Sequence, residues 1–134
     1  MSDGKTCKVE VAARPTLPIT EIRQLIFARD TLLDAILHSE RASNGWLGRA
    51  AVHGIAVRAG ENISVVVKAE REGQRNWVEV EFGAAQIAAA MMRYCRELHI
   101  PLPRRSQKSL EVQGDNVCLK MTVNLTTLPL HSRI

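Results

Sequence analysis

Two pairs of alternating apolar and polar runs, each joined by a short polar turn, do most to restrict the fold of this chain. Residues 63–70 and 77–82 form one pair, and residues 110–113 and 117–124 form the other. A period of two is typical of strands with one buried face, and a short turn containing glycine between two such runs predicts a hairpin. The sequence therefore predicts antiparallel strand pairing.

Two further stretches have the spacing of amphipathic helices. The first begins after a suitable N-cap at Thr20 and ends between residues 41 and 44, where Ser-Asn-Gly closes it. The second runs from Ala84 to His99 and is stopped by two prolines. Apolar residues recur along the first stretch at helical spacing: Ile22, Leu25, Ile26, Leu32, Leu33, Ile36 and Leu37. Its predicted length is large for a chain of this size.

The order of these elements indicates the fold class. Strands come in hairpins rather than alternating singly with helices, which favours an α+β fold. We expect an antiparallel sheet of four to five strands, with two helices packed mainly on one face, in a single domain over residues 1–134. Residues 49–58 are a weaker strand prediction because glycines interrupt them. Residues 1–18 are expected to be peripheral, with a short strand at 8–12, and residues 125–134 to form an irregular tail. No residue pattern repeats along the chain.

Composition points to a folded protein in a reducing compartment. The chain has 134 residues, of which 46% are hydrophobic and 24% charged. No apolar run is long enough to span a membrane, and the first residues lack the apolar core of a signal peptide. Cys7, Cys95 and Cys118 are odd in number and widely spaced, so they are expected to be free thiols. These features predict a cytoplasmic protein.

The net charge is concentrated in residues 93–108, RYCRELHIPLPRRSQK, which we call the basic segment. Of 18 Lys and Arg residues and 14 Asp and Glu residues, this segment holds five and one, and the remaining 13 of each sign cancel. Its cations are Arg93, Arg96, Arg104, Arg105 and Lys108. A positive surface on an otherwise balanced protein predicts an anionic partner, and arginine binds phosphate in a planar, bidentate way. We therefore expect a phosphate-bearing ligand such as a nucleic acid or a nucleotide.

The same charges also have a structural interpretation. Positive residues at the end of a helix complement its dipole, and Arg93 and Glu97 have the spacing of a helical ion pair. Arg104 and Arg105 are also placed to pair with Glu79, Glu81 or Glu111 across the sheet. The two interpretations make opposite predictions about which charges are paired.

Motifs for catalysis are not found in the sequence. It has no P-loop, no dinucleotide-binding glycine pattern, and no histidine or cysteine spacing that predicts a metal site. Few aromatic residues are available to stack on single-stranded nucleic acid. Glu79 with Glu81, Asp30 with Asp34, and the Gly83-Ala84-Ala85 turn are weak candidates for acid–base chemistry or phosphate binding. A non-catalytic binding or regulatory module is the favoured interpretation, and an enzyme of unrecognised type is the third hypothesis.

The second hypothesis is a module for protein interaction or assembly. The apolar surface of the first helix extends beyond one narrow stripe, which predicts contact with both a sheet and a second subunit. The candidate partner-binding residues are Leu25, Leu32, Trp46 and Trp77. Whichever hypothesis holds, we expect the protein to form a homodimer.

Overall fold

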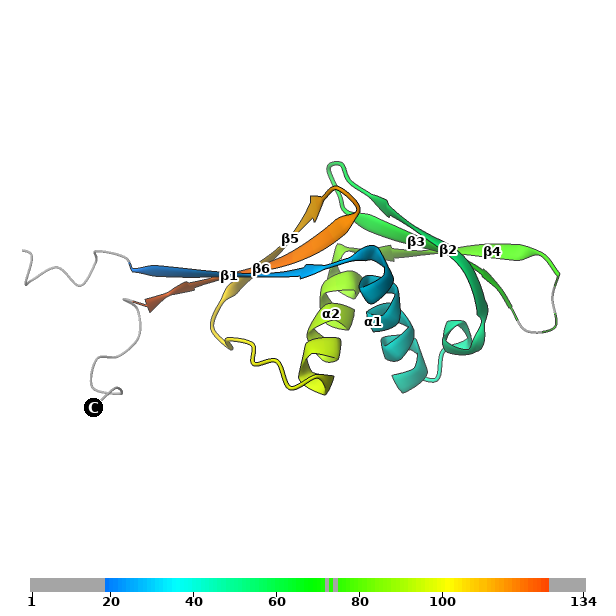
Figure 1. Ribbon diagram of the computed structural model, residues 1–134, viewed down its shortest axis with the longest axis horizontal. Coiled ribbons are helices and arrows are strands. Elements are labelled where there is room, and N and C mark those ends of the chain that lie inside the picture. Colours follow the sequence, from blue (N-terminus) through cyan, green and yellow to red (C-terminus); the bar gives the residue numbers. More distant parts are fainter. Residues whose placement is uncertain (1–18, 72, 74, 126–134) are drawn as a thin grey trace, which may run out of the picture.

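In the described part of the chain, six strands form two antiparallel sheets of three strands each, and two α-helices lie beneath them (Figure 1). The computed structural model describes residues 19–71, 73 and 75–125. The short strand predicted at 8–12 and most of the predicted tail lie outside them. The elements in chain order are β1 (Thr20–Phe27), α1 (Arg29–Ala42), the short 3₁₀ helix η2 (Trp46–Arg49), β2 (Ala51–Arg58), β3 (Ser64–Glu70), β4 (Trp77–Gly83), α2 (Ala84–Glu97), β5 (Gln107–Gln113) and β6 (Asn116–Asn124).

The chain runs twice through the order strand, helix, hairpin. The first half is β1, α1, β2 and β3, and the second is β4, α2, β5 and β6. The halves interlock, because the sheets have the orders β1–β6–β5 and β2–β3–β4. Each sheet therefore consists of the hairpin of one half and the first strand of the other. The topology thus repeats, although no residue pattern in the sequence shows it.

The α+β class is confirmed, but the single sheet of four to five strands is wrong. The two hairpins belong to different sheets, because each is completed by a strand from the other half of the chain. The helices accordingly pack against the inner faces of two sheets rather than on one face of a single sheet (Figure 1). Residues 51–58 form β2, so the weaker strand prediction is confirmed.

The predicted start of the first helix is also wrong. Residues 20–27 form β1, which pairs antiparallel with β6, and α1 begins only at Arg29 after an N-cap at Ala28. In TEIRQLIF, the spacing of Ile22, Leu25 and Ile26 suits a helix, but Leu25 and Phe27 also alternate with polar or outward residues as in a strand. Pairing with β6, nearly a hundred residues later in the chain, selects the strand. The predicted helix end and the second helix agree with α1 and α2.

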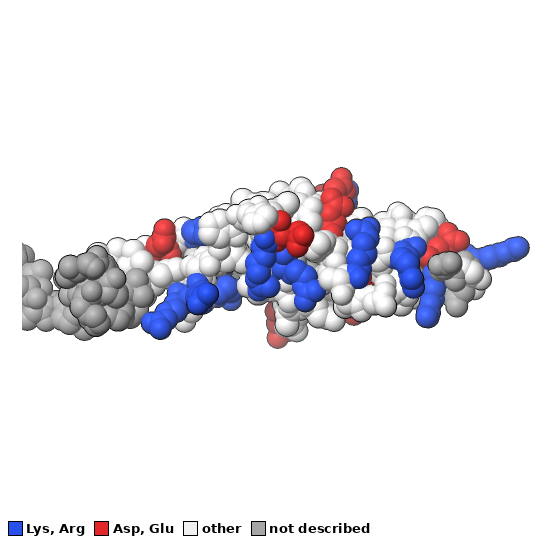
Figure 2. All heavy atoms as spheres, turned by 90° about the horizontal axis from the view of Figure 1, so that it is seen from below, with Lys and Arg blue, Asp and Glu red and all other residues white. Residues whose placement is uncertain are grey.

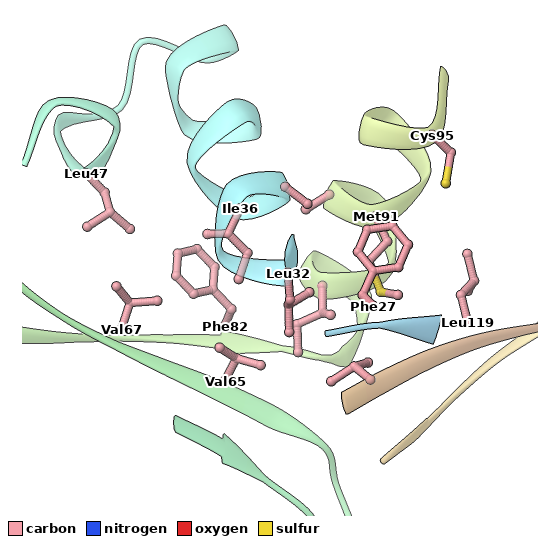
Figure 3. Close-up of a cluster of buried hydrophobic side chains, with 14 of the residues drawn as sticks. Phe27, Leu32, Ile36, Leu47, Val65, Val67, Phe82, Met91, Cys95 and Leu119 are labelled. Carbon is pink, nitrogen blue, oxygen red and sulfur yellow. The ribbon is translucent and has the colours of Figure 1, made fainter. Parts of the chain in front are cut away.

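The core lies where the helices meet both sheets (Figure 3). Leu32 and Ile36 of α1 and Met91 of α2 are buried there, with side chains from both sheets around them. Alternate residues of the central strands point into it, namely Val65, Val67 and Ala69 of β3 and Val117, Leu119, Met121 and Val123 of β6. This alternation confirms the strand pattern predicted for the two hairpins.

Candidate anion-binding surface

The loop from α2 to β5 carries the centre of the basic segment and is held at several points. Ile100 N–H donates to Cys95 O at 2.8 Å, and His99 at the helix end has a positive φ of 60°. Arg23 Nη1 of β1 donates to Pro101 O at 2.8 Å, and Ser106 Oγ donates to Pro103 O at 3.2 Å. These bonds fix the backbone that leads to the next two arginines.

Apolar side chains of the same loop help to anchor it. Ile100 and Leu102 are partly buried and pack against the core, whereas Arg104 and Arg105 are exposed. The prolines fix φ and reduce the backbone freedom of this connection. The loop therefore presents its two arginines to solvent from a backbone that is held from beneath.

The C-terminal ends of the two helices lie on the same side of the molecule (Figure 1). Arg41 lies in the last turn of α1 and Arg96 in the last turn of α2, and Arg93 lies one turn before it. Seen from this side, Lys and Arg atoms form a broken row along the molecule with fewer acidic atoms between them (Figure 2). Helix ends and the loop therefore share one basic face.

The five cations of the basic segment are exposed, and none forms an ion pair or side-chain hydrogen bond with another described residue. Their predicted acidic partners are engaged elsewhere or lie apart. Glu97 is 3.7 Å from His38 Nε2, Glu79 is 3.9 Å from Lys68 Nζ, and Glu111 is 3.7 Å from Lys120 Nζ. The ion pairs of the structural interpretation are thus not formed, although Arg96 still complements the dipole of α2.

The structure does not bring all five cations together. Lys108 lines a cleft of about 360 Å³ beside Ala84 and Ala85 in the first turn of α2, whereas Arg93 and Arg96 lie in its last turns. A helix of 14 residues is roughly 20 Å long, so Lys108 is well separated from them. Arg105 lines a different hollow, beside Thr20, Thr122 and Asn124 at the end of the β1–β6–β5 sheet. The basic residues form a row and do not enclose a pocket.

The four predicted partner-binding residues fall into different environments. Leu32 is fully buried in the core, and Leu25 lies half-buried on the inner face of β1, so the predicted helical interface does not form. Trp46 is half-buried, with the Arg71 guanidinium 5.3 Å from its ring centre. Trp77 is 58% exposed. Of the four, only Trp77 is open to a partner.

Trp77 belongs to a small cluster on the outer face of the β2–β3–β4 sheet. Its ring stacks on His53 with ring centres 4.5 Å apart, and His53 Nε2 is 2.8 Å from Glu70 Oε2. A register shift between Val52 and Gly54 places His53 at this face. The cluster lines a shallow hollow of about 360 Å³. The stack occupies one face of the indole, and no serine, threonine or cysteine is among the described residues that line the hollow.

Other reactive groups in the described residues are dispersed, buried or already paired. No group of three or more metal-ligating side chains comes together among them. Cys95 and Cys118 are fully buried, and burial raises the pKa of both thiols; nearby Arg23 opposes this for Cys95. The Gly83 N–H at the start of α2 donates to Gln86 Oε1 at 2.9 Å, so this amide of the predicted phosphate turn is already paired.

Comparisons with protein-family models, with curated proteins and with solved structures found no match to this chain. None of the helices in the described residues is long and apolar enough to cross a membrane. Among the residues that position the basic face, Arg23 was missed by sequence reasoning. It lies about eighty residues before the loop that it holds, inside a stretch predicted to be helical, and no local pattern connects the two.

Proposed function

We propose that this chain is a non-catalytic, cytoplasmic binding module that binds an extended polyanion through the basic face formed by Arg93, Arg96, Arg104 and Arg105. The observation that carries the proposal is the state of these arginines: all four are exposed, and none is paired with an acidic side chain among the described residues. Free guanidinium groups on a held backbone lose less conformational freedom on binding phosphate than groups on a loose loop would.

The arrangement favours an extended ligand over a single nucleotide. A nucleotide site is normally a concave pocket in which a few polar groups converge. Here the arginines are spread along a helix end and a loop, and two hollows near the segment are lined by one of its cations each. A row of cations suits a chain of phosphates, such as the backbone of a nucleic acid, which is bound through charge rather than base sequence.

Binding of a labelled DNA oligonucleotide, followed by fluorescence anisotropy over a range of salt concentrations, tests the proposal. The wild-type chain should bind both single strands and duplex at low salt. The double variant Arg104→Ala/Arg105→Ala should bind about tenfold more weakly or worse. The plot of log K against log salt should also become less steep, by roughly 1–2, because a variant with fewer phosphate contacts releases fewer counterions on binding. Its thermal melting temperature should stay close to that of the wild type.

The matched control is Arg58→Ala/Arg75→Ala, which removes two exposed arginines outside the basic segment. It changes the net charge equally and should leave most of the affinity. Equal losses in both variants would show that only net charge matters. A double variant at 104 and 105 that unfolds would show that these arginines are structural, and either result would reject the proposal.

A further inference from the structure

Among the described residues, the first strand, β1, has a free edge. It lies at the rim of the β1–β6–β5 sheet and pairs with β6 and with no other described strand. Leu125 N–H donates to Ile19 O at 2.8 Å, so residues 19 and 125, which continue the register of the two strands, are a hydrogen-bonded pair. In an antiparallel ladder the bonded pairs alternate, so the odd-numbered residues of β1 bond to β6. The backbone groups of Thr20, Ile22, Gln24 and Ile26 therefore point away from the sheet.

The outer side chains of the same strand are unusual for an edge. Ile22 is 54% exposed and Ile26 is 53% exposed, with uncharged Gln24 between them. Edge strands normally carry charges that discourage pairing with another chain. The topologically equivalent edge strand, β4, does so, because Glu79 and Glu81 are exposed on its outer face. On β1 neither the backbone nor the outer side chains oppose addition of a further strand.

We propose that β1 pairs antiparallel with β1 of a second copy of this chain, about a two-fold axis at Gln24. A second copy fits because the outer residues are arranged symmetrically about Gln24, with an isoleucine two positions before it and another two positions after it. In this register Ile22 of each copy lies opposite Ile26 of the other, and the backbone groups that face the free edge bond to each other. Both exposed isoleucines are covered, and a continuous six-stranded sheet forms.

The neighbouring registers centred on Arg23 and Ile22 fit less well. An axis at Arg23 would place two arginines directly opposite each other, which is destabilising. An axis at Ile22 would leave Ile26 uncovered, because it would lie beyond the first residue of β1 in the second copy. The axis at Gln24 places Glu21 opposite Phe27 of the second copy, two residues before its Arg29. Glu21 and Arg29, the first residue of α1, are both exposed and form no ion pair with described residues, so a residue of each sign is available near each end of the strand pair.

The pairing would also unite the two basic faces. The two-fold axis of an antiparallel strand pair is perpendicular to the sheet, so the inner faces of both copies lie on the same side. Arg23 ties each basic loop to β1 through Pro101 O. A dimer would therefore present two rows of arginines on one side. This consequence rests on the proposed function, whereas the strand pairing does not.

Disulfide trapping of the full chain tests the register. In a Cys7→Ser background, Gln24→Cys places two thiols opposite each other on the axis, with Cα atoms about 5.5 Å apart, within the range that a disulfide needs. Mild oxidation under native conditions should link this variant into a covalent dimer, and oxidation in urea should not. Glu79→Cys on β4 is the matched control, and Ile22→Cys and Arg23→Cys report the competing registers. Trapping of any of these three as efficiently as Gln24→Cys would overturn the proposal.

Sedimentation velocity provides a measurement that does not depend on cysteine chemistry. The wild-type chain should be dimeric at micromolar concentration, and Ile26→Lys should raise the dimer dissociation constant by about tenfold or more, because it buries a charge against an isoleucine. Glu79→Lys should leave the dimer intact. Since residue 26 is exposed on the monomer, the variant should keep its fold, which circular dichroism checks. A wild-type chain that stays monomeric, or a dimer unaffected by Ile26→Lys, would also overturn the proposal. Because neither readout involves DNA, failure here leaves the proposed function untouched.

Discussion

The two halves of the chain share one topology but differ at their first strands. β1 and β4 each lie at a sheet edge, and each is followed directly by a helix of 14 residues. The outer face of β1 carries Ile22, Gln24 and Ile26, and that of β4 carries Trp77, Glu79 and Glu81. Two strands in the same topological position thus differ in outer-face charge: that of β1 is uncharged, and that of β4 carries two carboxylates. The common fold sets the positions of the edges, and the side chains determine which edge can accept a partner.

The halves also differ at the ends of their helices. α1 is followed by η2, and Arg41 Nε turns back to donate to Gly48 O at 3.1 Å. α2 is followed by the longer proline-containing loop, whose arginines stay exposed and unpaired among the described residues. In the first half a helix-end arginine serves the local fold, whereas in the second half the arginines are left available. This contrast is the main reason to place binding at the second half.

The largest effect is expected where the halves are most alike. Leu32 is the fourth residue of α1 and Ile87 the fourth of α2, and both are fully buried. Leu32→Ala and Ile87→Ala should each lower the free energy of unfolding by about 2–5 kcal/mol, because each leaves a cavity in the shared core. Urea denaturation measures both. If Leu32→Ala instead dissociated a dimer and left the stability of the monomer unchanged, Leu32 would lie at an interface and the equivalence would fail.

The strength of local patterns decides how much of this could be predicted from the sequence. β3, β4 and β6 alternate over enough residues for period two to dominate, and α2 has strong helical periodicity, so these elements were predicted. β1 has both periods, and a partner in β6 far along the chain resolves the ambiguity. The interlocking of the two sheets is likewise a property of non-local pairing, which no window of sequence contains.

The candidate sites show the same division. The basic segment is continuous in sequence, so Arg93 to Arg105 could be named, although Lys108 proves to lie near the opposite end of α2. The predicted interface depended on Leu25 and Leu32 lying on one helix, and it was lost when β1 proved to be a strand. Ile22, Gln24 and Ile26 are alternate residues of the sequence. If these residues are read as a strand, this spacing indicates an uncharged outer face and could have identified the free edge.

A smaller effect should follow from removing the hydrogen bond by which Arg23 of the first half holds the loop between α2 and β5 in the second half. Arg23→Met keeps much of the aliphatic side chain but removes the guanidinium that donates to Pro101 O. Because that carbonyl belongs to an exposed residue and can bond to water, the loss of unfolding free energy should be about 1 kcal/mol. Arg41→Met removes the corresponding bond to Gly48 O in the first half and is the matched comparison. Only Arg23→Met should also increase amide hydrogen exchange in residues 100–106; equal exchange in the two variants would mean that Arg23 does not hold the loop.

The smallest expected effect is a pH dependence of stability that only the second half should show. Cys95, in the last turns of α2, is a buried thiol, whereas the corresponding residue of α1 is the part-exposed Glu40. Burial raises the pKa of Cys95 above its ordinary value of 9.0. Above that pH the unfolded chain loses the thiol proton while the folded chain keeps it, so the unfolded state binds fewer protons and stability falls as pH rises. Below pH 9 the contribution of Cys95 to the free energy of unfolding is constant.

Cys95→Ala should lower stability at every pH through the cavity it leaves, yet its unfolding free energy should decline less between pH 9 and 10.5 than that of the wild type. Identical slopes in urea denaturation across that range would show that Cys95 is not protected from ionisation by burial, and hence that the end of α2 is open to water in solution.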